Sequence, residues 1–114
     1  MSPIIQNVIV GCIYVAINIG YKKIFLFGVE HSWLKQTFVG EDNLCYLQDA
    51  HFYGSNSRPW VITNGTNIKF HELLRMLSRT FSAYWDLKKY AEYNGDVKIY
   101  NKTPNSFIDA FEKI

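Results

Sequence analysis

A short apolar run between two lysines and a glycine is the feature that most constrains the fold of this chain. Residues 21–33 read YKKIFLFGVEHSW, and Ile24 to Phe27 are all apolar residues that favour strands. An unbroken run of this length is typical of a strand buried on both faces, as in parallel sheets. Gly28 ends the run, and polar and aromatic residues follow. The sequence therefore predicts a strand over residues 22–27 whose carboxyl end carries a polar loop, the place where open α/β sheets bind ligands.

A helix is expected before this strand. Ser2 and Pro3 make a favourable helix start, as the N-cap and the first helical residue, and Gly20 stands where a left-handed C-cap belongs. Between them, apolar residues recur at steps of three and four from Ile4 to Ile19. Apolar character extends round most of this helix, which is expected when a helix is covered on more than one side.

The middle of the chain is predicted to form a hairpin and a long loop. Residues 37–39 and 44–47 flank a polar turn, Gly-Glu-Asp-Asn, as in a β-hairpin. Residues 48–61, QDAHFYGSNSRPWV, are rich in turn formers, and long irregular segments are often functional. Asn64-Gly65 could close a second hairpin, but an apolar helical stripe begins at once and favours a helix starting near Thr66.

The last third of the chain is predicted to contain a long helix, a strand and a short helix. The long helix would run to Asn94-Gly95, and the polar residues within 78–83 suggest a break or kink, with two consecutive helices fitting equally well. A strand follows over residues 97–100. Asn105 or Ser106 would then cap a last short helix ending at Phe111.

These elements predict an α/β fold: a partial, Rossmann-like parallel sheet flanked by helices, with an inserted β-hairpin. A strand, a helical crossover and a second strand form a right-handed parallel unit. At 114 residues the chain is expected to be a single domain, residues 1–114. Two parallel strands are too few to bury the apolar helix faces, so further chain or a partner subunit must cover them. Self-association into a homo-oligomer is therefore expected.

Composition narrows the classes of function. Hydrophobic residues make up 48% of the chain, which argues against disorder, and a net charge of +2 gives no reason to expect a nucleic-acid partner. Cys12 and Cys45 lack the spacing of a metal site, so we expect no metal and no cofactor. Asn18 and the two lysines interrupt the apolar N-terminal stretch, which argues against a transmembrane segment. Without a signal-peptide pattern, a cytoplasmic location is expected, at most peripheral to the inner membrane.

The best candidates for catalysis are an acidic residue and a histidine that are adjacent in the sequence, and a second histidine in the turn-rich loop. Glu30 and His31 follow the first strand, and a loop could turn both into one site, where the carboxylate orients or charges the imidazole. A surface carboxylate is an equally good interpretation of Glu30. His51 lies in the turn-rich loop and could act as a base or contact a phosphate.

Five further residues could bind a substrate. Arg58 suits a bidentate grip on a phosphate or carboxylate. Trp33 or Tyr53 could offer an apolar face to a sugar ring. Asn101 and Thr103 follow the second strand, so they should join the same sheet edge, where they could hold a sugar or ribose or could cap the last helix.

Taken together, several segments resemble a known bacterial family. YKKIFLFGVEHSW, HFYG, HELLRMLSRTFSAYWDLKKYAE and VKIYNKTPNSFIDAF are similar to the C-terminal half of MptE-like proteins, named after a 6-hydroxymethylpterin pyrophosphokinase. The order of these motifs is also similar to the C-terminal part of bacterial lipooligosaccharide sialyltransferases. The resemblance covers about residues 8–111. It differs at Glu30, where the family usually has Asp, and at Ser32, where the sialyltransferases have a tyrosine.

The resemblance implies a function. It implies the C-terminal half of a Rossmann-like, glycosyltransferase-like protein of surface polysaccharide or lipopolysaccharide biosynthesis, which binds a nucleotide-sugar or sugar phosphate without a required metal. The glycine-containing phosphate loop of the family lies upstream of the matching part and has no counterpart here, so independent catalysis is not expected. Two alternatives stay open: a non-catalytic assembly module formed by dimerisation, and a pterin diphosphotransferase-like protein.

Overall fold

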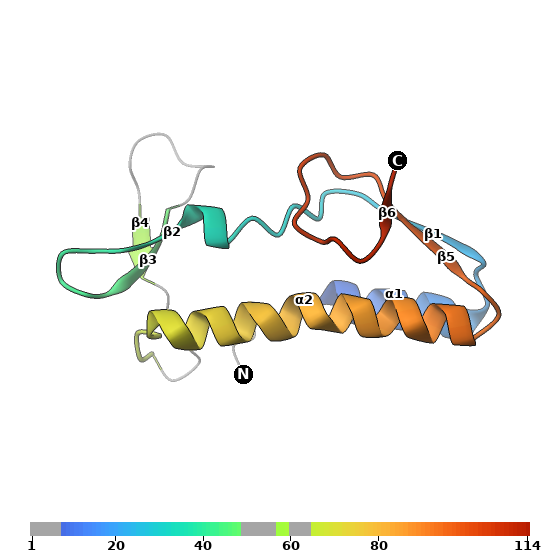
Figure 1. The fold of residues 1–114 in the computed structure, drawn as a ribbon, viewed down its shortest axis with the longest axis horizontal. Coiled ribbons are helices and arrows are strands. Elements are labelled where there is room, and N and C mark those ends of the chain that lie inside the picture. Colours follow the sequence, from blue (N-terminus) through green and yellow to red (C-terminus); the bar gives the residue numbers. More distant parts are fainter. Residues whose placement is uncertain (1–7, 49–56, 60–64) are drawn as a thin grey trace.

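The computed structural model describes residues 8–48, 57–59 and 65–114, and within them the chain has a mixed α/β fold (Figure 1). A three-stranded parallel sheet is flanked by helices, and a separate antiparallel sheet lies beyond it. The elements are α1 (Val8–Ile19), β1 (Lys23–Leu26), a 3-10 turn η1 (Leu34–Gln36), β2 (Thr37–Val39), β3 (Cys45–Gln48), β4 (Ser57–Pro59), α2 (Phe70–Tyr93), β5 (Lys98–Asn101) and β6 (Glu112–Lys113).

The parallel sheet has the order β1–β5–β6. β1 and β5 pair from Lys23↔Lys98 to Leu26↔Asn101, as expected for two apolar runs joined by a helical crossover. β6 pairs with the end of β5, at Tyr100 and Asn101. The sequence did not indicate this third strand, because it has only two residues and no apolar run of its own.

Both long helices lie on the same side of the parallel sheet (Figure 1). The main core forms where Ile13 and Ile17 of α1 and Tyr84 and Leu87 of α2 meet the sheet, with Leu26 among the sheet residues. On the other face, the side chains are more exposed. There Phe25 and Tyr100 stack with ring centroids 5.4 Å apart, and the Lys102 ammonium lies 5.6 Å from the Phe25 ring centre.

A second core lies at the other end of α2. The antiparallel strands are ordered β2–β3–β4, and β2 pairs with β3 across the polar turn at residues 40–43. Cys45 and Leu47 of β3 pack with Ile68, Leu73 and Leu77. α2 therefore carries one core at each end, and the molecule is elongated, measuring 51 × 28 × 18 Å.

α2 is one continuous helix from Phe70 to Tyr93, so the break or pair of helices suggested near residues 78–83 is wrong. The Thr80 hydroxyl donates to the Met76 carbonyl within the helix at 3.1 Å, so this polar side chain is satisfied without a break. The helix begins at Phe70 rather than near Thr66, and the Lys69 amide donates to the Glu72 carboxylate at 3.1 Å. Its last residue is Tyr93 and Asn94 is its C-cap, which agrees with the predicted end at Asn94-Gly95.

The predicted helix capped by Asn105 or Ser106 and ending at Phe111 is also wrong. This segment forms a turn and bends, and Asn105 has a left-handed backbone with a φ of 58°. The Phe107 amide donates to the Glu30 carbonyl at 2.9 Å, and the Ser106 hydroxyl donates to the Val29 carbonyl at 2.6 Å. The segment therefore bonds to the loop after β1, and these bonds replace those that a helix would make within itself.

α1 ends where the sequence predicts, since Ile19 is its last residue and Gly20 adopts a φ of 113°. The predicted start at Ser2 and Pro3 lies outside the described residues. None of the helices in the described ranges is both long enough and apolar enough to cross a membrane.

Candidate functional site

The loop after β1 is anchored to the segment that follows β5. Gly28 turns the chain with a φ of 70°. The buried Val29 amide then donates to the Thr103 hydroxyl at 3.1 Å, while the Val29 carbonyl accepts from Ser106. Because β1 and β5 are parallel neighbours, their carboxyl ends meet at one sheet edge, and these bonds join the two loops there. The next residues, Glu30 and His31, are held in place by this anchor.

His31 is partly buried against aromatic side chains. Its Nε2 atom lies 2.7 Å from the Tyr84 hydroxyl, and its ring centre is 4.4 Å from that of Trp33. Tyr84 comes from the middle of α2 and is fully buried. Burial lowers the pKa of His31 from 6.5 to about 4, although the Glu30 carboxylate acts in the opposite direction. The imidazole is therefore neutral at neutral pH.

Glu30 is exposed beside this histidine. Its main chain is fixed, because its carbonyl accepts the Phe107 amide at 2.9 Å. An exposed carboxylate next to a neutral imidazole can orient a hydroxyl or water, while the imidazole can take up its proton. The structure thus brings together Glu30, His31 and Trp33 from the predicted site.

Asn101 and Thr103 lie at the predicted edge, but their side chains face inward. They are 1% and 4% exposed. Thr103 accepts from Val29, and the Asn101 amide oxygen accepts from the Thr103 amide at 3.0 Å. Their contact with a sugar stays a prediction, and this placement favours support of the loops. The alternative role, capping a last helix, is wrong because no helix forms there.

The remaining predicted site residues lie elsewhere or outside the described residues. The backbone of Arg58 lies in β4 and pairs with Leu47, so it belongs to the antiparallel sheet. His51 and Tyr53 lie outside the described residues. Arg58, His51 and Tyr53 therefore stay predictions as ligand contacts.

Sequence reasoning missed two residues that build this site. In the sequence, Tyr84 is one apolar-face residue among several in the predicted long helix, and Ser106 is indicated only as a possible helix cap. A buried tyrosine usually finds a hydrogen-bond partner, so a hydroxyl in the middle of a core stripe is a usable signal. No signal in the sequence indicates that its partner is His31, which lies 53 residues away.

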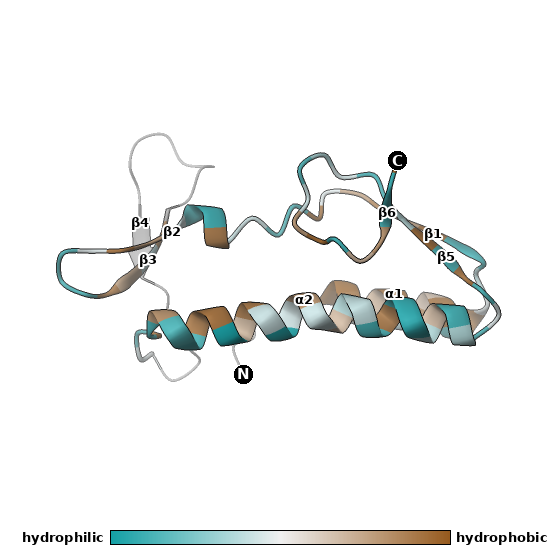
Figure 2. Cartoon of the chain, viewed as in Figure 1, coloured by the Kyte–Doolittle hydropathy of each residue, from teal (hydrophilic) through white to brown (hydrophobic). Residues whose placement is uncertain are grey.

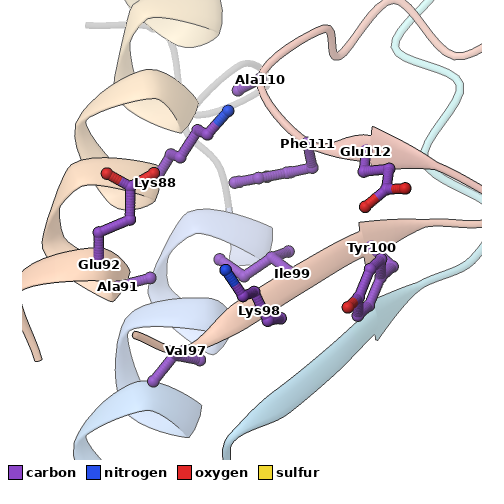
Figure 3. A pocket seen from close by; sticks show the side chains of 10 residues that line it. All are labelled: Lys88, Ala91, Glu92, Val97, Lys98, Ile99, Tyr100, Ala110, Phe111 and Glu112. Atoms are coloured by element: carbon purple, nitrogen blue, oxygen red, sulfur yellow. The ribbon is translucent and has the colours of Figure 1, made fainter. Parts of the chain in front are cut away.

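A pocket of about 270 Å³ lies away from these residues, between the last turns of α2 and the strands β5 and β6 (Figure 3). Its floor is apolar, and the Phe111 ring points across it toward α2. Its rim carries charges of both signs, from Lys88 and Glu92 of α2 and from Glu112. The full lining comprises Lys88, Ala91, Glu92, Val97, Lys98, Ile99, Tyr100, Ala110, Phe111 and Glu112. None of the predicted site residues takes part.

The described part of the chain contains no group of three or more His, Cys, Asp or Glu side chains that could hold a metal ion. Comparisons with protein-family models, curated proteins and solved structures found no match.

Proposed function

We propose that this chain is the C-terminal half of a Rossmann-like, glycosyltransferase-like protein of bacterial surface polysaccharide or lipopolysaccharide biosynthesis. Its ligand would be a nucleotide-sugar or a sugar phosphate, bound at the loop after β1. One observation carries the proposal: a neutral, partly buried His31 stands beside the exposed Glu30 at the carboxyl edge of a parallel sheet. The sequence motifs that resemble the MptE-like proteins and the sialyltransferases include both residues.

The environment of His31 suits a base that is activated when its ligand binds. With a pKa of about 4 the free imidazole is a weak base. The negative charge of a phosphate placed beside it would favour the protonated form and raise the pKa towards neutrality. Tyr84, at 2.7 Å from Nε2, would hold the ring so that Nδ1 is left for the reacting group.

The arrangement of the two helices supports the proposal that this chain is half of a larger domain. α1 and α2 lie on the same face of the sheet (Figure 1). Crossovers between parallel strands are almost always right-handed. A strand preceding α1, in a longer protein or in another chain, would therefore pair with β1 on the edge away from β5. Such a strand would extend the sheet in the direction that a Rossmann-like fold requires.

Titration of the ¹⁵N-labelled chain with a CMP-sugar, a UDP-sugar and a simple sugar phosphate tests this proposal. We expect binding that can be followed residue by residue through the amide shifts. Amide shifts should concentrate at residues 29–33 and 102–107, and His31→Asn should abolish them. His71→Asn is the matched control, since His71 is exposed on α2. Shifts confined to the pocket of Figure 3, or unchanged binding in His31→Asn, would contradict the proposed site.

A second candidate function is a non-catalytic assembly module. It is favoured by the exposed apolar surface of α1, where Val8 is 76% exposed and Ile19 is 68% exposed. An apolar helix face of this kind normally has a partner.

A further inference from the structure

The pocket between α2 and the strands β5 and β6 has a preformed apolar floor (Figure 3). Ala91, Val97, Ile99 and Phe111 line it, and all four belong to the main core. The Val97 amide donates to the Ala91 carbonyl at 3.0 Å, which ties the end of α2 to the residue before β5. The Phe111 ring meets the Tyr84 ring edge to face, with ring centroids 5.9 Å apart. The floor therefore needs no rearrangement to receive a ligand.

The pocket forms because β6 covers only part of β5. β6 pairs with β5 at Tyr100 and Asn101, and no strand of the described chain pairs with the same edge at Lys98 and Ile99. The space left between this edge and α2 measures about 270 Å³. Pockets for drug-sized ligands begin at about 300 Å³, so this one suits a smaller molecule, such as a single ring with a short chain.

Charged side chains surround this floor, and two of them are carboxylates without an ion pair. Figure 2 shows that the last turns of α2 and the strand β6, which border the pocket, are hydrophilic. Lys98 already forms an ion pair with Asp96, at 3.2 Å, so these two charges offset each other. Within the described ranges, neither Glu92 nor Glu112 forms an ion pair. Both carboxylates are therefore available to a ligand.

The two carboxylates stand on opposite walls of the pocket. Glu92 comes from α2 and Glu112 from β6, and the Phe111 ring lies between them in Figure 3. Lys88 is the other cation of the lining, and its Nζ atom lies 5.3 Å from the ring centre of Trp85, a contact that attracts an ammonium group. Two carboxylates against one ammonium leave the opening negative. A cation would therefore be attracted from both walls, and an anion would be repelled.

We propose that this pocket binds a small protonated amine whose apolar body is about one ring in size. The apolar body would pack on Ile99 and Phe111, where an aromatic ring gains a further contact with the Phe111 ring. The ammonium group would stay at the opening, where Glu92 and Glu112 can accept its hydrogen bonds. This pocket shares no residue with the loop after β1, so the proposal is independent of the function proposed above.

A matched set of ligands tests which charge the pocket selects. Phenethylammonium, its neutral analogue 2-phenylethanol and the anion 3-phenylpropionate carry the same ring. Titration of the ¹⁵N-labelled chain should show the tightest binding for the ammonium and the weakest for the anion, with amide shifts at residues 88–92, 97–99 and 110–112. Equal affinities, tighter binding of the anion, or no binding of the ammonium would overturn the assignment of an amine. Ammonium-induced shifts confined to other residues would overturn the assignment of this pocket.

Replacing the two carboxylates tests their contacts with the ammonium group. Glu92→Gln and Glu112→Gln each remove a charge at nearly constant size, and each should weaken phenethylammonium binding by about two- to fivefold, as expected for an exposed ion pair. The affinity for 2-phenylethanol should not change. Asp86→Asn is the matched control, since Asp86 is exposed on α2 and does not line the pocket. Equal weakening by Asp86→Asn, or full affinity when both glutamates are replaced, would refute the proposed contacts.

Discussion

The residues around His31 change both its conformation and its pKa. Its backbone has a left-handed φ of 51°, which few residues other than glycine adopt without cost. The hydrogen bond to Tyr84 and the contact with Trp33 offset that cost. The same contacts remove the ring from water, and so they set both its position and its protonation state.

This environment predicts a pH-dependent stability. The folded pKa is about 4 and the ordinary value is 6.5, so between these values the unfolded chain binds a proton that the folded chain does not. The free energy of unfolding should therefore fall as the pH drops from about 6.5 to about 4. Denaturant unfolding at several pH values, for the wild type and His31→Gln, measures this effect. The variant should lose less stability over this range, and a His31 ring signal titrating near 6.5 would contradict the explanation.

At this scale the sequence predicted the right loop but only part of its chemistry. The position of Glu30 and His31 directly after a strand can be predicted from a local sequence pattern. The inward orientation of Thr103 depends on a bond to Val29, 74 residues away, and no local pattern records it. The role of Tyr84 could not be predicted for the same reason, because its partner His31 is 53 residues away.

Among the elements, α2 depends on a narrow buried face. Leu73 is fully buried, and its neighbour Leu74 is 40% exposed. Both are Leu within the same turn, so they have the same helix propensity and differ in burial.

Replacing each of these leucines with Ala separates burial from propensity. Leu73→Ala should reduce the free energy of unfolding by about 2–5 kcal/mol, because it leaves a cavity. Leu74→Ala should cost less than about 1 kcal/mol. Thermal or denaturant unfolding measures both, and equal losses would mean that the face assigned to the core is wrong.

Elements with a strong local period were predictable, and those made by distant contacts were not. β1, β5 and α2 lie close to their expected positions because apolar runs and helical stripes are local signals. The last helix failed because Ser106 and Phe107 bond to the loop after β1. The expected break in α2 failed because Thr80 finds its partner within the helix.

At the scale of the whole molecule, two cores share one helix. The main core surrounds Tyr84 and Leu87, the second core surrounds Leu73 and Leu77, and Phe81 packs against both. Among the described residues, no other hydrophobic side chain packs against both cores, so each end should be able to open without the other.

Hydrogen exchange tests this independence. Leu47→Ala, in the second core, should speed amide exchange in β2 and β3 and leave β5 protected. Ile99→Ala, in the main core, should do the reverse. Each replaced side chain is at least nine-tenths buried, so the pair is matched. Uniform acceleration in both variants would show that the chain unfolds as one cooperative unit.

The pairing of β1 with β5 affects the order in which parts of the chain fold. Val29 and Thr103 are 74 residues apart, whereas Cys45 bonds to Asn67, only 22 residues away. Closing the longer loop costs more chain entropy and slows folding. During synthesis, the segment after β5 also leaves the ribosome later than the loop after β1. We therefore expect the edge that holds Glu30 and His31 to assemble after the antiparallel sheet, once the loop after β1 and the segment after β5 have met.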